Sequence, residues 1–182
     1  MARTAAPGTR ERIVAAAAPL FYTQGIRAVG MAQVVEAAGC GKNLLYTHFP
    51  AKTDLVAAYL SLVRGERERS TGRAVQGARG PEEALIAVLG EIADRVREPG
   101  FRGCAMRNYL TEFPTGDDAP DRIARDYLAS TEQQIRDLSR DDTLADRLWL
   151  VVESLYAVAG RPDAPARARV AVDLATELVG TG

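Results

Sequence analysis

The sequence is poor in the residues from which metal sites, disulfide frameworks and many catalytic centres are built. Its 182 residues include a single histidine, His48, and two cysteines, Cys40 and Cys104, which lie far apart. Two separated cysteines offer no disulfide framework and fit a reducing compartment, and a zinc site built on His and Cys is not expected. Neither a carboxylate pair nor a nucleophile–histidine pair is evident. We therefore expect no enzyme: no catalytic residue, no metal and no cofactor.

Long hydrophobic runs are also missing. No apolar run reaches the roughly 18 residues that span a bilayer, and 47% hydrophobic with 26% charged residues is typical of a soluble globular protein. The apolar stretch from Ile13 to Tyr22 follows several arginines, as a secretory signal would, but Glu11 interrupts them and no small-residue cleavage site follows. We expect a cytoplasmic protein with no membrane partner.

The near-neutral net charge of −1 conceals an asymmetry along the chain. Residues 1–56 carry six basic and three acidic side chains, whereas the remainder is acidic overall. A basic front on an acidic body is typical of a module that contacts a polyanion. The two lysines of the chain, Lys42 and Lys52, flank the one histidine.

Apolar residues recur at helical spacing along nearly the whole chain, and no useful β-alternation is present. Gly and Pro residues separate the periodic segments. The pattern predicts an all-α protein of about nine helices, with Thr9 as the N-cap of the first. The expected helices are Thr9 to Gln24, Met31 to Ala38, Lys42 to Phe49, Lys52 to Arg73, Pro81 to Arg97, Cys104 to Phe113, Asp121 to Arg140, Thr143 to Ala159 and Ala164 to Val179.

The second and third predicted helices have the form of a helix-turn-helix. Gly39 can adopt the positive φ that the turn requires, and small apolar residues such as Val34 and Leu45 can hold the two helices together. Phe49 is expected in the core. The third helix keeps a polar outer face made of Lys42, Asn43, Thr47 and His48. A short helix of this kind fits the major groove of B-DNA, where its first residues reach base edges.

These residues also carry a family resemblance. The stretch VVEAAG at residues 34–39, followed by Lys42 and by LYTHFPAKTDL at residues 45–55, resembles the DNA-binding module of the tetracycline-repressor (TetR) family. The match covers about 47 residues, from Thr9 to Leu55. It implies an N-terminal three-helix DNA-binding domain, residues 1–55, and a C-terminal helical domain, residues 56–182, that binds an effector and dimerises.

The resemblance also implies roles for seven residues. Lys42, Asn43 and Leu44 would approach base edges, with Thr47 one helical turn further on. Tyr46 and His48 would bind phosphates through the phenol hydroxyl and a ring nitrogen, and Lys52 would add a phosphate contact. Two positions depart from the family pattern: Gly30 and Gly41 stand where hydroxyl residues often cap the second and third helices, so any phosphate bond from those hydroxyls is lost.

The C-terminal part contains candidates for a ligand pocket. Trp149, Glu153 and Tyr156 share one helix face, and a carboxylate among apolar neighbours needs a partner, either Arg107 or a ligand. Aromatic and methionine residues at helical spacing are also typical of an ordinary core. The complete set of candidate ligand-binding residues is Met106, Tyr109, Phe113, Tyr127, Trp149, Glu153 and Tyr156.

The last two predicted helices are apolar on more than one face, which predicts a homodimer with a four-helix interface. Together these features predict a dimeric transcriptional regulator that reads a pseudo-palindromic operator in double-stranded DNA. Repression with release by a small-molecule effector is the expectation that the resemblance adds. Two alternatives stay open: a DNA-binding activator or architectural protein without an effector, and an all-α enzyme or carrier.

Overall fold

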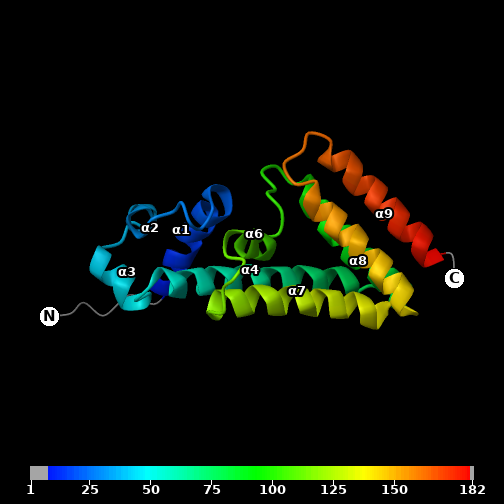
Figure 1. Cartoon of the computed structure of the whole chain (residues 1–182), viewed down its shortest axis with the longest axis horizontal. Coiled ribbons are helices and arrows are strands. Elements are labelled where there is room, and N and C mark those ends of the chain that lie inside the picture. Colours follow the sequence, from blue (N-terminus) through cyan, green and yellow to red (C-terminus); the bar gives the residue numbers. More distant parts are fainter. Residues whose placement is uncertain (1–7, 181–182) are drawn as a thin grey trace. The chain divides into compact units, whose positions relative to one another are not determined.

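The computed structural model describes residues 8–180, and within this range it contains nine α-helices and no strand (Figure 1). The predicted all-α fold is confirmed, and each predicted helix end lies within two residues of the observed one. The helices are α1 Thr9–Gln24, α2 Met31–Ala38, α3 Lys42–His48, α4 Lys52–Val75, α5 Pro81–Arg97, α6 Ala105–Glu112, α7 Ala119–Leu138, α8 Asp142–Ala157 and α9 Ala164–Gly180.

The chain forms two compact units. The first unit comprises the described residues up to Arg64 together with Ala105–Arg125, and the second comprises Gly65–Cys104 together with the described residues from Asp126. The long helices α4 and α7 each contribute to both units. The helix α6 therefore belongs to the same compact unit as the three N-terminal helices, although residues 49–104 separate it from them in sequence.

In the first unit α1 packs on α2, and α2 packs on α3. Phe49, expected in the core, is fully buried, and the ring of Phe21 lies 5.5 Å from that of Tyr59 on α4. The prediction that Thr9 caps α1 is wrong: Gly8, with φ of 81°, holds the N-cap position, and Thr9 is buried as the first helical residue. The buried residues of α1 and of the connection between α1 and α2 are Thr9, Ile13, Val14, Ala17, Phe21, Ile26 and Val29.

The core of the second unit lies where α5, α8 and α9 pack together. The helix α5 begins with Pro81 at its first turn, followed by Glu82 and Glu83, which suit the positive end of the helix dipole. Its buried face is apolar except for one residue, Arg95. The fully buried large side chains here are Leu85, Leu89, Leu148 and Leu155, with Ile135 contributed by α7.

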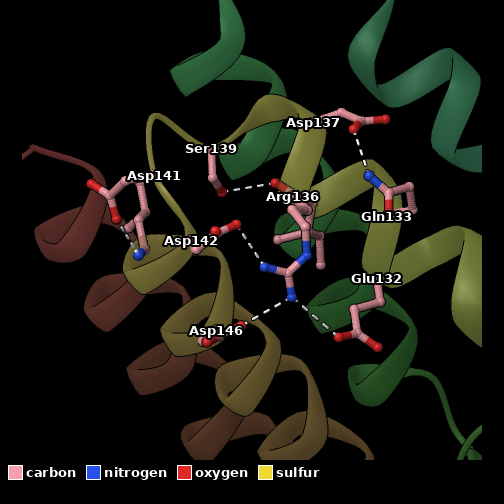
Figure 2. A network of polar contacts seen from close by, with 10 residues as sticks. Glu132, Gln133, Arg136, Asp137, Ser139, Asp141, Asp142 and Asp146 are labelled. Carbon is pink, nitrogen blue, oxygen red and sulfur yellow. Dashed lines mark hydrogen bonds and ion pairs between the residues drawn. The ribbon is translucent and has the colours of Figure 1, made fainter.

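A polar network fastens the turn between α7 and α8 (Figure 2). The guanidinium of Arg136 donates to Asp142 at 2.9 Å, to Asp146 at 3.0 Å and to Glu132 at 3.5 Å. The side chain of Asp141 caps α8 by accepting from the backbone N–H of Leu144 at 2.8 Å. One arginine thus links the last turns of α7 to the first turns of α8.

Candidate nucleic-acid interface

The turn between α2 and α3 has the backbone geometry that a helix-turn-helix requires. Gly39 has φ of 58°, a left-handed conformation that glycine adopts without a Cβ penalty. Its N–H donates to the carbonyl of Glu36, and the N–H of Cys40 donates to that of Val35, so the end of α2 is capped by backbone groups. Gly41 then starts α3 in an extended conformation.

The helix α3 divides into a buried side and an exposed side. Leu45 is fully buried beneath it, while Lys42, Asn43 and Thr47 are exposed. Leu44 is half-buried. Tyr46 is 39% exposed, and the Lys42 ammonium lies 6.0 Å from the centroid of its ring. The two turns of α3 therefore present polar groups outward, as a helix that enters a groove must.

The side chain of His48 is less exposed to solvent than those of Tyr46 and Thr47 on α3. The side chain is half-buried, and its Nε2 atom is buried with no hydrogen-bond partner. A phosphate contact from His48 would therefore use Nδ1 or need the ring to rotate. The proposed phosphate contact of His48 thus requires more adjustment than that of Tyr46.

The start of α4 carries Lys52 next to the end of α3. The carboxylate of Asp54 accepts from the backbone N–H of Ala51 at 2.8 Å and so closes the first turn of α4. Partial burial lowers the pKa of Lys52, and the negative charge of Glu112 acts in the opposite direction. Glu112 therefore acts electrostatically on Lys52, one of the residues predicted to contact phosphate.

The C-terminal end of α6 reaches the connection between α1 and α2. The Glu112 carboxylate accepts from the backbone N–H groups of Ile26 at 3.0 Å and of Arg27 at 2.8 Å. The Arg27 guanidinium lies 4.8 Å from the ring centroid of Phe113. Sequence reasoning missed Glu112, because its partners are backbone groups 86 and 85 residues away and leave no pattern in the sequence.

The candidate ligand-binding residues fall into two sets. Met106, Tyr109 and Phe113 belong to the first unit; Met106 and Tyr109 are buried on α6, and Phe113 directly follows the helix. The rings of Tyr109 and Phe113 stack with centroids 5.1 Å apart, and the Tyr109 hydroxyl donates to Asp118 at 3.1 Å. Burial and this hydrogen bond raise the pKa of Tyr109. In this first set, each ring therefore has a partner within the first unit.

The other four candidates lie in the second unit. Tyr127 and Tyr156 are buried, and Trp149 and Glu153 are half-buried on α8. The Tyr156 hydroxyl accepts from Arg95 at 3.3 Å. Burial raises the pKa of both tyrosines, so their hydroxyls stay protonated and able to donate. Two of the four candidates are thus near neighbours of a buried cation.

Arg95 is the centre of this buried group, and sequence reasoning missed it. The side chain is 7% exposed and forms an ion pair at 3.0 Å with Glu91, one turn earlier on α5. The Nε of Arg95 is buried and has no hydrogen-bond partner. Together with Tyr127, Arg95 lines a cavity of about 180 Å³. The available signal was a charge pair at positions i and i+4 on an apolar helix face.

Known proteins similar to this chain share its helical layout. A TetR-family transcriptional regulator from Streptomyces coelicolor has a TM-score of 0.85 at 24% identity and covers 94% of both chains. A TetR transcriptional regulator from Chloroflexus aurantiacus has a TM-score of 0.81 at 22% identity and covers 95% of this chain and 94% of that one. These likenesses concern the fold.

Sequence comparison adds curated relatives. The transcriptional activator FasR of Mycolicibacterium smegmatis is 29% identical over 82% of this chain and 68% of its own length. The transcriptional repressor BdcR of Escherichia coli is 30% identical over 70% of this chain and 64% of its own length. Both are named as helix-turn-helix regulators.

The fold and the exposed polar helix α3 define a helix-turn-helix DNA-binding regulator. Residues 13–59 match the family described as bacterial regulatory proteins, tetR family. The N-terminal helix-turn-helix module of this chain is therefore that of the TetR family of transcriptional regulators. Within the described residues, no helix has both the length and the apolar character that a membrane span needs.

Proposed function

We propose that the protein is a cytoplasmic, dimeric repressor that binds a pseudo-palindromic operator through α3 and is released by a small-molecule effector. The observation that carries the proposal is the exposure of Lys42, Asn43 and Thr47 on a short helix behind a glycine turn. In this proposal Lys42, Asn43, Leu44 and Thr47 read base edges, while Tyr46, His48 and Lys52 contact phosphates.

The homodimer is proposed from the apolar surface of α8 and α9. Leu150, Val170 and Leu174 are 68%, 65% and 45% exposed. A groove of about 430 Å³ runs between the two helices, with Leu155, Val158 and Leu174 among its lining residues. Two helices from each copy would bury these side chains in a symmetric interface. One α3 per copy would then enter successive major grooves of one operator.

Effector release is proposed from the second unit. The cavity beside Arg95 and Tyr127 is lined mainly by charged and polar side chains, with Val88 and Ile92 as its aliphatic part, and we expect it to suit a polar effector. Of the candidate ligand-binding residues, Tyr127 lines this cavity, and the Tyr156 hydroxyl accepts a hydrogen bond from Arg95. A ligand that prefers the conformation with low DNA affinity would shift helix α4, change the spacing of the two α3 helices and release the operator.

DNA binding is tested on the segment upstream of the protein's own gene. Fluorescence anisotropy with this segment and with a scrambled sequence of equal length should show selective binding that weakens as salt rises. Replacing Tyr46 and Lys52 together by Ala should abolish selective binding, whereas the matched double variant Ser61→Ala with Thr176→Ala should leave it unchanged. Equal affinity for both DNAs would overturn the proposed operator reading.

Activation is a second candidate, because one curated relative is named as an activator. A promoter–reporter strain with and without the regulator gene separates the two. Higher reporter output in the deletion strain supports repression, and lower output supports activation.

A further inference from the structure

We propose that Glu112 is a positioning residue for DNA binding: its carboxylate, on α6, holds the α1–α2 connection in the conformation from which α2 and α3 bind DNA. The inference goes beyond the proposed repressor function, because it requires only that the protein binds DNA. It assigns a role to a residue outside the helix-turn-helix.

The geometry is that of one carboxylate shared by two adjacent backbone donors. Ile26 and Arg27 follow the end of α1 at Gly25, where the chain has left the helix and its N–H groups have no helical partner. Glu112 accepts from both, at 3.0 and 2.8 Å. Hydrogen bonds to an ionised carboxylate are stronger than those between neutral groups. The turn is therefore fixed by a group from a distant part of the sequence.

A second contact joins the same two segments. The Arg27 guanidinium lies 4.8 Å from the centroid of the Phe113 ring, within the range of a cation–π interaction. Gly25 also leaves room for the carboxylate, since a Cβ at this position would lie 3.3 Å from Glu112 Oε1. The Glu112 carboxylate, the Phe113 ring and the space at Gly25 together hold the end of α6 against the α1–α2 connection.

The turn passes its position on to the helices that bind DNA. Ile26 and Val29 are buried at 4% and 0% exposure, so the segment from Gly25 to Gly30 is anchored at both ends. At Gly30 the backbone N–H donates to the Gln33 side chain at 2.8 Å, and α2 begins with the next residue. A shift of the turn would therefore move α2, and with it α3, because α2 packs on α3.

The negative charge of Glu112 also bears on the proposed phosphate contacts. Its charge acts on Lys52, the proposed phosphate contact at the start of α4. Removing the carboxylate charge would by itself favour binding to a polyanion. A loss of DNA affinity in a Glu112→Gln variant would thus run against simple electrostatics and point to positioning.

The test compares Glu112→Gln with Thr111→Ala, a matched control on the same helix whose hydroxyl bonds only to the carbonyl of Arg107 on its own helix. We expect Glu112→Gln to raise the Kd for the DNA segment upstream of the gene about tenfold, or about 1.4 kcal/mol. The Kd is determined on the DNA-binding-active fraction from a stoichiometric titration. Hydrogen exchange should accelerate at the amides of Ile26 and Arg27, because each amide now uses its own carboxylate oxygen and the glutamine NH2 group that replaces one of them is a donor.

The outcomes separate positioning from simple stabilisation. Faster exchange at the two amides with an unchanged Kd overturns the proposal, and so does a Kd change that vanishes after correction for the active fraction. Glu112→Asp keeps the charge with a shorter reach, and a smaller rise in Kd is expected; if Glu112→Gln does not fold, an unchanged Kd in Glu112→Asp overturns the proposal. Failure of wild-type protein to select any DNA sequence would instead overturn the proposed operator reading.

Discussion

The two compact units place polar and apolar groups in opposite ways. In the first unit α3 covers buried Leu45 and presents Lys42, Asn43 and Thr47 outward. In the second unit α9 presents Val170 and Leu174 outward, while the charged pair of Arg95 and Glu91 lies inside. Both arrangements leave a helix face uncovered, but the chemistry of the two faces differs.

The difference indicates which partner each face suits. A polar, basic helix face loses little by staying in water and gains from a polyanion such as DNA. An exposed apolar face is favoured only when another apolar surface covers it. The buried ion pair has the opposite requirement, because each charge needs the other once water is excluded. Four substitutions can break or sharpen this comparison.

The largest effect is expected from Leu174→Glu on α9. A charge at the centre of the proposed dimer surface should separate the two copies, and each monomer would then hold only one half-site. The loss of the second, linked contact should weaken operator binding by about 10²- to 10⁴-fold. Sedimentation velocity reports the dimer and anisotropy reports the affinity. Leu62→Glu, at an exposed leucine of α4, is the control; a dimeric Leu174→Glu variant would contradict the proposed interface.

Arg95→Met should reduce stability strongly. The substitution leaves the Glu91 carboxylate, 10% exposed, without its ion-pair partner, and we expect a loss of about 3 kcal/mol in the free energy of unfolding. Urea denaturation measures this. The double variant Glu91→Leu with Arg95→Met removes both charges and should recover most of the loss. If the single variant is as stable as wild type, the Glu91 carboxylate does not need Arg95 as its ion-pair partner, and the contrast drawn between the two units fails.

Asn43→Ala tests the sequence-reading side of the comparison. An asparagine that contacts a base edge supplies about 1–3 kcal/mol of discrimination. We expect the variant to bind its preferred site about tenfold more weakly and to lose selectivity at one base pair of each half-site. Binding to a library of single-base operator variants measures this. An unchanged selectivity profile would remove Asn43 from the base-reading set.

Lys52→Ala should produce the smallest change. A lysine that contacts only phosphate affects all DNA sequences equally, so affinity should fall by less than tenfold with selectivity unchanged. The dependence of log K on log salt should become shallower by about one unit. Titrations at several salt concentrations measure the slope, and Lys52→Arg should retain it. A salt slope equal to that of wild type would show that the Lys52 ammonium is not near the DNA.

Local features of this protein could be read from the sequence with good accuracy. The helical spacing of apolar residues, together with Gly and Pro between segments, predicted all the observed helices. The positive φ of Gly39 and the burial of Phe49 were also predicted correctly. The N-cap at Thr9 was wrong, since a hydroxyl residue at a helix start fits both the cap and the first helical position.

The sequence by itself determined the helices, the glycine turn and the polar face of α3, because these depend on neighbours within a few residues. Only the tertiary structure showed that Glu112 of α6 binds the turn after α1 and that Arg95 lies buried beside Tyr156. The physical reason is the same in both cases. A carboxylate that binds backbone N–H groups, or an arginine that meets a tyrosine 61 residues away, leaves no periodic signal, and chain folding alone brings the partners together.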